Sequence, residues 1–222
     1  MSGLILFDFD GTFADTAPDM GAAANMQRSK RGFKPLPIEV LRPFVSMGAR
    51  GLVKAALSFD VDHPEFEAAR QGFLSDYQQV MTTDTCLFDG IDTLLEQIRA
   101  ADMQWGIVTN KHTFLAEPIM AFLNLPDCAV LVCGDTCAHA KPHPMPLEYA
   151  AQQTGYQVEQ CVYVGDDLRD IQSARSAGMP SIAAAYGYCG EHPVDQWQAD
   201  YVANSTAELW PAIEHARGLK VR

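Results

Sequence analysis

The sequence predicts an α/β fold with a doubly wound parallel-sheet Rossmann-like core and an inserted α-helical cap. Two observations predict this architecture: short, continuously apolar runs recur along most of the chain, and one long segment lacks them. Continuous apolarity is typical of strands that are buried on both faces of a parallel sheet and joined by helices. The runs are Leu4–Phe7, Trp105–Val108, Ala129–Cys133, Cys161–Val164 and Ser181–Ala185.

The segment without strand-like runs is predicted to be helical. Its apolar residues recur at spacings of three and four, which is the period of an amphipathic helix. The first helix is expected to have Pro18 just inside its start and Asp15 or Thr16 as its cap, and to stop at Gly32. Further helices are expected near residues 38–45, 48–59 and 64–81. We therefore expect a core formed by residues 1–15 and 88–222, and a cap at residues 16–87 that overhangs the first strand.

The composition excludes several classes of protein. The 222 residues are 48% apolar and 20% charged, which is typical of a globular protein, and the net charge is −12. An acidic chain is a poor partner for nucleic acid, because binding to the phosphate backbone needs a basic surface. No apolar stretch approaches the roughly 20 residues that cross a membrane. The N-terminus shows no signal peptide, so we expect a cytoplasmic location and no membrane partner.

Two carboxylates, Asp8 and Asp10, follow the first predicted strand, and a turn at Gly11-Thr12 follows them. Carboxylates are rarely left beside a buried strand unless they are paired or bind a metal. The glycine turn lets the backbone approach a phosphate closely. An ordinary Asp-Gly turn with solvated acids is the alternative interpretation.

Polar residues also follow later predicted strands. Thr109 and Asn110 close the run that ends at Val108, and they offer a hydroxyl and a backbone N–H to a phosphate oxygen. Lys141 is a compact cation suited to a phosphoryl oxygen, and Pro142 stiffens the loop that presents it.

A second acidic cluster follows the run that ends at Val164. It contains Asp166, Asp167 and Asp170. Oxygen ligands at two different strand ends are what Mg²⁺ requires. Because the functional sites of doubly wound sheets lie at the carboxyl ends of the strands, we expect these acids in one site.

In order and residue type, these four segments resemble the four motifs of the haloacid dehalogenase-like hydrolases, and the resemblance covers nearly the whole chain. Most members of that family are magnesium-dependent phosphatases with an aspartate nucleophile. The resemblance implies that Asp8 is the nucleophile and Asp10 the general acid/base. It further implies that Thr109 binds phosphate and that Lys141 steadies the phosphoryl group.

The same resemblance implies a Mg²⁺ cofactor. Its ligands would be Asp8, the main-chain carbonyl of Asp10 and Asp166, with Asp167 and Asp170 as auxiliary acidic groups whose roles the sequence does not separate. An aspartate at the position of Asp10 favours phosphoryl transfer over dehalogenation, because dehalogenation gives no proton to an alkoxide.

The place of the insertion, after the first motif, resembles a subgroup with a small helical cap. This subgroup includes phosphoglycolate phosphatases and is similar to N-acetylmuramic acid 6-phosphate phosphatases. Both substrates carry a carboxylate, which Arg50 could bind, although a surface salt bridge is the alternative for this residue. The implied partner is a small phosphorylated metabolite, bound by Gly11, Thr12, Arg50, Asn110 and Lys111.

Two other functions remain open at this stage. A phosphomutase similar to β-phosphoglucomutase would return the phosphoryl group to a sugar. A non-catalytic regulatory protein on the same fold would commonly lack a catalytic acid or the lysine, all of which are present here. The oligomeric state is open between monomer and homodimer.

Overall fold

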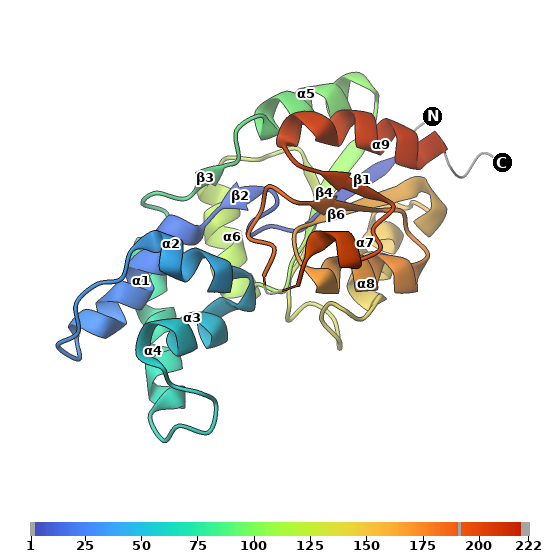
Figure 1. Cartoon of the computed structure of the whole chain (residues 1–222). Helices are drawn as coiled ribbons and strands as arrows, with labels where there is room; N and C mark the ends of the chain where they lie inside the picture. The colour runs from blue at the N-terminus through green and yellow to red at the C-terminus, as the bar shows by residue number, and fades with distance from the viewer. Residues whose placement is uncertain (1–2, 191, 219–222) are drawn as a thin grey trace.

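A six-stranded sheet forms the centre of the molecule, which is described for residues 3–190 and 192–218 by a computed structural model (Figure 1). All neighbouring strands of this sheet are parallel, in the order β5-β4-β1-β6-β7-β8. The strands are β1 (Leu4–Phe7), β4 (Gln104–Val108), β5 (Cys128–Val132), β6 (Cys161–Gly165), β7 (Ser181–Ala184) and β8 (Tyr201–Ala203). The predicted strands are confirmed to within one residue. The edge strand β8 was not predicted, because it has three residues and is partly exposed.

Helices cover both faces of the sheet. Successive side chains of β1 point to opposite faces, as in any strand. Ile5 and Phe7 belong to the core beneath α5 (Ile91–Ala100), α6 (Thr113–Phe122) and α9 (Leu209–Gly218). Leu4 and Leu6 belong to a second core beneath α7 (Met145–Thr154) and α8 (Leu168–Ala177). The doubly wound α/β architecture is therefore confirmed.

A group of helices lies beside this core and corresponds to the predicted helical segment (Figure 1). It comprises α1 (Ala17–Ser29), α2 (Ile38–Leu41), α3 (Gly48–Leu57) and α4 (Phe66–Val80). The helix expected over residues 38–45 is instead split into α2 and the 3₁₀ helix η1 (Arg42–Met47). Pro43 accounts for the break, since proline has no N–H to donate and disfavours the α conformation at the residue before it. Other 3₁₀ turns are η2 (Val158–Gln160), η3 (Val194–Gln196) and η4 (Thr206–Glu208).

Two short strands join the helical group to the core. Strand β2 (Ala14–Asp15) pairs antiparallel with β3 (Cys86–Leu87), so the two chain segments that connect the parts run side by side. No strand was expected between residues 16 and 87, and this expectation was wrong at Cys86–Leu87. A strand of two residues is too short to show a strand pattern in the sequence. The boundaries at residues 15/16 and 87/88 stay a prediction. Among the helices of residues 3–190 and 192–218, none is both long and apolar enough to span a membrane.

Candidate active site

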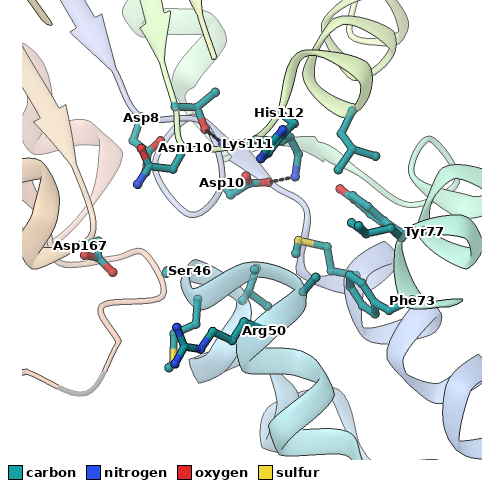
Figure 2. A pocket seen from close by; sticks show the side chains of 18 of the residues that line it. Asp8, Asp10, Ser46, Arg50, Phe73, Tyr77, Asn110, Lys111, His112 and Asp167 are labelled. Carbon is teal, nitrogen blue, oxygen red and sulfur yellow. Dashed lines mark hydrogen bonds and ion pairs between the residues drawn. The ribbon is translucent and has the colours of Figure 1, made fainter. Parts of the chain in front are cut away.

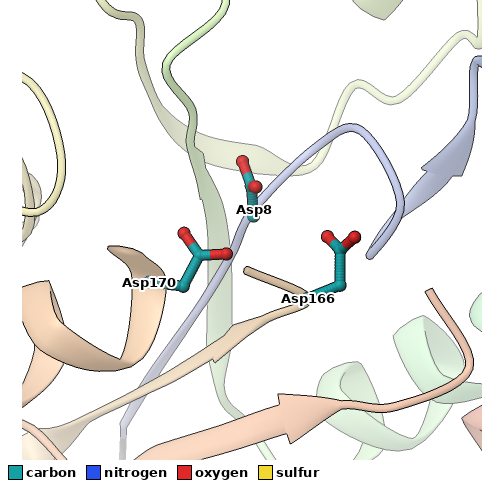
Figure 3. Close-up of side chains that lie close together, drawn as sticks. All are labelled: Asp8, Asp166 and Asp170. Atoms are coloured by element: carbon teal, nitrogen blue, oxygen red, sulfur yellow. The ribbon is translucent and has the colours of Figure 1, made fainter. Parts of the chain in front are cut away.

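Three carboxylates meet where β1 and β6 end (Figure 3). The two strands pair in parallel, and the N–H of Asp8 donates to the carbonyl of Val164 at 2.8 Å. Asp8 and Asp166 are therefore brought together across the sheet, and Asp170 joins them from the first turn of α8. One oxygen from each of these three carboxylates lies within 4.8 Å of the others.

The start of α8 separates the roles of two acids that the sequence left undivided. Asp167 is the N-cap of this helix, and its carboxylate pairs with the Arg169 side chain at 2.8 and 2.9 Å. Asp170 accepts the N–H of Asp167 through Oδ2, at 3.0 Å. The other carboxylate oxygen of Asp170, Oδ1, is left to face Lys141 and the remaining two carboxylates. Asp167 thus lies outside the three-carboxylate group, and Asp170 lies within it.

Lys141 connects the acids. Its Nζ lies 2.9 Å from Asp8 Oδ1 and 2.7 Å from Asp170 Oδ1. It also donates to the carbonyl of Val108 at 2.9 Å and to the hydroxyl of Tyr163 at 2.7 Å. The sequence analysis missed Tyr163, because a tyrosine inside an apolar strand is not distinguished from a core residue by its position.

Burial and mutual repulsion dominate the electrostatics of this cluster. The pKa of Asp166 is raised well above its ordinary range by burial and then by the charges of Asp8 and Asp170. Burial and the Asp8 charge raise the pKa of Asp170 to about 7, although Lys141 opposes this. Burial works against the charge of Lys141, but Asp170 and Asp8 outweigh it and raise the lysine pKa. Several carboxylate oxygens in one buried place, with more negative than positive charge, fit a hard divalent cation.

Asp10 has different partners from Asp8. Its Oδ1 accepts from the Thr16 hydroxyl at 2.5 Å and from Lys111 Nζ at 2.9 Å. Thr16 is the N-cap of α1 by position, but its hydroxyl makes no capping bond; the Asp15 carboxylate accepts the N–H of Ala17 instead. The Asp10 side chain therefore stands apart from the three carboxylates, beside a cation.

Several predicted substrate-binding side chains are engaged within the protein. The Thr12 hydroxyl donates to Asp166 at 2.7 Å, and Gly11 has a φ of +89° and no room for a Cβ beside the Asp166 carboxylate. The Asn110 side chain donates to the carbonyl of Lys141 and accepts its N–H, at 2.9 and 3.0 Å. These contacts fix the positions of the Asp166 carboxylate and of Lys141. Thr109, which is 3% exposed, accepts the N–H of Lys111 through its hydroxyl at 3.1 Å.

A cavity of about 510 Å³ opens above the acids, between the core and the helical group (Figure 2). From the core it is lined by Asp8, Asp10, Thr109, Asn110, Lys111, Lys141, Asp167 and Asp170, among others. The helical group contributes Ser46, Arg50, Phe73 and Tyr77. Arg50 is exposed, and its side chain makes no hydrogen bond or ion pair with any residue within 3–190 or 192–218. The structure thus brings all the predicted core motifs to one place, with Arg50 at the cavity wall.

Other residues of this region were missed from the sequence. Tyr188, in the loop after β7, donates its backbone N–H to Asp166 at 2.9 Å and its hydroxyl to Asp15 at 2.8 Å. Arg169 donates to the carbonyl of Ser46 at 2.6 Å and so links core to cap. Tyr188 and Asp166 are 22 residues apart, and the other two pairs are more than a hundred residues apart, so no local pattern could have indicated these contacts.

Comparisons with known proteins identify the family of this chain. The family model described as "Haloacid dehalogenase-like hydrolase" matches residues 5–184. A phosphoglycolate phosphatase of Xanthomonas campestris pv. campestris is 45% identical over 208 residues, covering 93% of this chain and 94% of its own. An N-acetylmuramic acid 6-phosphate phosphatase of Pseudomonas aeruginosa is 42% identical over 216 residues, covering 96% and 95%.

A solved structure shares the fold. The crystal structure described as a predicted phosphoglycolate phosphatase from Haemophilus somnus superposes with a TM-score of 0.83 at 25% identity, covering 95% of this chain and 97% of its own. Together with the family match over most of the sequence, this confirms the resemblance that the four motifs indicated. The chain belongs to the haloacid dehalogenase-like hydrolases.

Proposed function

We propose that this protein is a magnesium-dependent phosphomonoesterase that hydrolyses a small carboxylated metabolite phosphate through an aspartyl-phosphate. The observation that carries the proposal is the arrangement of Asp8. Its carboxylate faces the cavity beside Lys141 and two further carboxylates, and Asp10 lies two residues on with a different set of partners. One acid is thus placed to attack, and another to handle a proton.

Asp8, Asp166 and Asp170 would hold the metal, together with the main-chain carbonyl of Asp10. The donor set fits, because all its side chains are carboxylates and three of their oxygens already lie within 4.8 Å. Mg²⁺ bound there would reduce the repulsion between a carboxylate nucleophile and a phosphate dianion. Asp167, which is paired with Arg169, would position α8 and would not bind the metal directly.

The chain's own residues then divide the reaction. Asp8 attacks the phosphorus in line and forms the aspartyl-phosphate. Lys141 holds Asp8 in place and neutralises charge on the phosphoryl oxygens, and Thr109 is positioned beside the same group. Asp10 protonates the leaving alcohol oxygen and then takes a proton from the water that hydrolyses the intermediate.

The substrate class is inferred from the cavity and the relatives. Two enzymes that this chain resembles at more than 40% identity are named for 2-phosphoglycolate and N-acetylmuramic acid 6-phosphate, which both carry a carboxylate. A cavity of about 510 Å³ lies within the range of ordinary small-molecule sites. Basic side chains also line the cavity, among them Lys111, Lys141 and Arg50, so the site can accept an anion despite the net charge of the chain.

The test is phosphate release, with Mg²⁺ and with a chelator, from both of these compounds and from simple sugar phosphates. We expect Mg²⁺-dependent release and a strong preference for one of the carboxylated compounds. Release that requires a sugar bisphosphate would indicate a phosphomutase. No Mg²⁺-dependent release from any compound would favour a non-catalytic protein and contradict the proposal.

A further inference from the structure

One buried polar atom of the cap has no partner. Tyr77 lies on α4 and is fully buried, yet its hydroxyl is the only buried side-chain nitrogen or oxygen atom within residues 3–190 and 192–218 that makes no hydrogen bond. Leaving such a group unpaired is unfavourable, and in native proteins each instance needs an explanation. Tyr77 lines the cavity above Asp8 and Asp10, and its hydroxyl is directed towards Lys111 (Figure 2). The unpaired atom therefore belongs to the site.

Lys111 has spare hydrogen-bonding capacity in the same corner. Its side chain is 4% exposed, and its ammonium lies 4.9 Å from the centroid of the Tyr77 ring. In the described part of the chain this ammonium makes one hydrogen bond of good geometry, to Asp10 Oδ1, although it carries three protons. Burial works against its charge, but Asp10 and then the nearby Tyr77 phenol contribute to the rise of its pKa. The corner thus holds more donors than acceptors, and one carboxylate, that of Asp10, balances the charge of its ammonium.

An acceptor-rich anion is the group that would satisfy this corner. A second cation would be repelled by the ammonium of Lys111, so an acceptor fits this corner better than a further donor. The same cavity has apolar walls, formed in part by Met20, Phe73 and Leu115. Apolar surroundings strengthen a charged hydrogen bond made within them. Because Lys111 also contacts Asp10, the anion would lie on the leaving-group side of the site, away from the phosphoryl group at Asp8 and Lys141.

We propose that Tyr77 and Lys111 form a carboxylate subsite, in which the Tyr77 hydroxyl and the Lys111 ammonium donate to a carboxylate on the leaving-group part of the substrate. The subsite rests on the proposed phosphomonoesterase function and deepens it. Lys111 has a flexible stem, so an incoming carboxylate can draw its ammonium towards the cavity and reach the hydroxyl. Tyr77 becomes a specificity-determining residue supplied by the cap, and exposed Arg50 is not the main carboxylate contact.

The experiment measures carboxylate preference in two matched substrate pairs. The pairs are 2-phosphoglycolate with ethyl phosphate, and N-acetylmuramic acid 6-phosphate with N-acetylglucosamine 6-phosphate. For each pair the preference is the ratio of kcat/KM for the carboxylated member to that for the other. Tyr77→Phe keeps the ring that stacks near Phe73, and removes only the hydroxyl. Tyr201→Phe, on β8 at the far edge of the sheet, is the matched control.

In the pair whose carboxylated member the wild type prefers, Tyr77→Phe should lower the preference about ten- to a hundredfold, as expected for one hydrogen bond to a charged group. Activity on the uncarboxylated member should change little, and Tyr201→Phe should match the wild type. The melting temperature of Tyr77→Phe without substrate should stay equal or rise, because the hydroxyl has no partner there.

Two results would overturn the subsite while leaving the phosphatase intact: a wild type that hydrolyses both members equally, or a preference that Tyr77→Phe leaves unchanged, whether or not both activities fall together. A large fall in the melting temperature of Tyr77→Phe would assign the hydroxyl a structural role and also reject the subsite. If the wild type hydrolyses none of the four compounds, the proposed function itself fails, and this outcome is distinct from the others.

Discussion

Mg²⁺ should stabilise this protein more at pH 7.5 than at pH 5.5. The metal would bind the acids at the ends of β1 and β6, and one of these acids loses its proton between the two pH values. Burial, followed by the Asp8 charge, raises the pKa of Asp170 from its ordinary 3.8 to about 7. Between these values the folded, metal-free protein binds a proton that the unfolded chain has already released. Its free energy of unfolding therefore falls as pH rises through this window.

The magnitude has an upper bound. A rise from 3.8 to about 7 corresponds to roughly 4 kcal/mol. Of this range, only the roughly 1.5 pH units between pH 5.5 and the folded pKa of about 7 fall within the measured window, so we expect about 2 kcal/mol. Mg²⁺ bound at this site would replace the proton as the counter-charge. As pH rises, fewer of these carboxylates carry a proton that competes with the metal. For a protein of this size, about 2 kcal/mol corresponds to roughly 4–8 °C in melting temperature.

The assay is thermal unfolding at pH 5.5 and 7.5, each with Mg²⁺ and with a chelator. The gain in melting temperature from Mg²⁺ should be about 4–8 °C larger at pH 7.5. In Asp170→Asn the amide imitates the protonated acid, so the pH dependence of the gain should shrink. An equal Mg²⁺ gain at both pH values in the wild type would refute the reasoning, as would an Asp170→Asn variant with the full wild-type dependence.

Three substitutions test other parts of the structure. Asp8→Asn should abolish phosphate release while the melting temperature stays within a few degrees; retained turnover would remove Asp8 from the nucleophile role. Arg50→Ala should weaken hydrolysis of a carboxylated substrate by less than tenfold, because the exposed guanidinium is screened by solvent, and p-nitrophenyl phosphate should be unaffected. A larger loss would make Arg50 the main carboxylate contact. Tyr188→Phe should destabilise the protein by about 2–4 kcal/mol in urea unfolding, because the Tyr188 hydroxyl accepts the N–H groups of Thr16 and Ala17 at 2.9 Å. Unchanged stability would mean that solvent or Asp15 replaces this acceptor.

The sheet and the meeting of the four motifs followed from the sequence. Continuous apolar runs identify strands buried on both faces, and parallel strands bring their carboxyl ends to one edge. Asp8 and Asp166 each come directly after such a run or close to its end, so their proximity was predictable once both strands were placed. Thr109 was predictable for the same reason, because it directly follows β4, whereas Lys141 lies in the loop after β5 and was predicted from the family resemblance.

The individual partners were decided by the tertiary structure. Asp167 and Asp170 look alike in sequence, but the first turn of α8 directs one to Arg169 and the other to Lys141. Thr16 has the features of a capping residue, but its hydroxyl bonds to Asp10 because the turn after β1 folds back on itself. Backbone propensity is a local property, whereas these hydrogen bonds depend on which side chains the fold brings within reach.

The cap shows this difference most clearly. Helical spacing was enough to predict α1, α3 and α4, because amphipathic periodicity is visible in any short window of sequence. Phe73 and Tyr77 both have the spacing of core residues on one helix, so periodicity does not distinguish one from the other. Only the packing of α4 over the core places the Tyr77 hydroxyl beside Lys111, in a cavity built from segments far apart in the chain. The sequence by itself determined the fold and the acids proposed to react, and the tertiary structure decided which cap side chain lies beside Lys111, because that contact depends on how two separately patterned parts of the chain pack together.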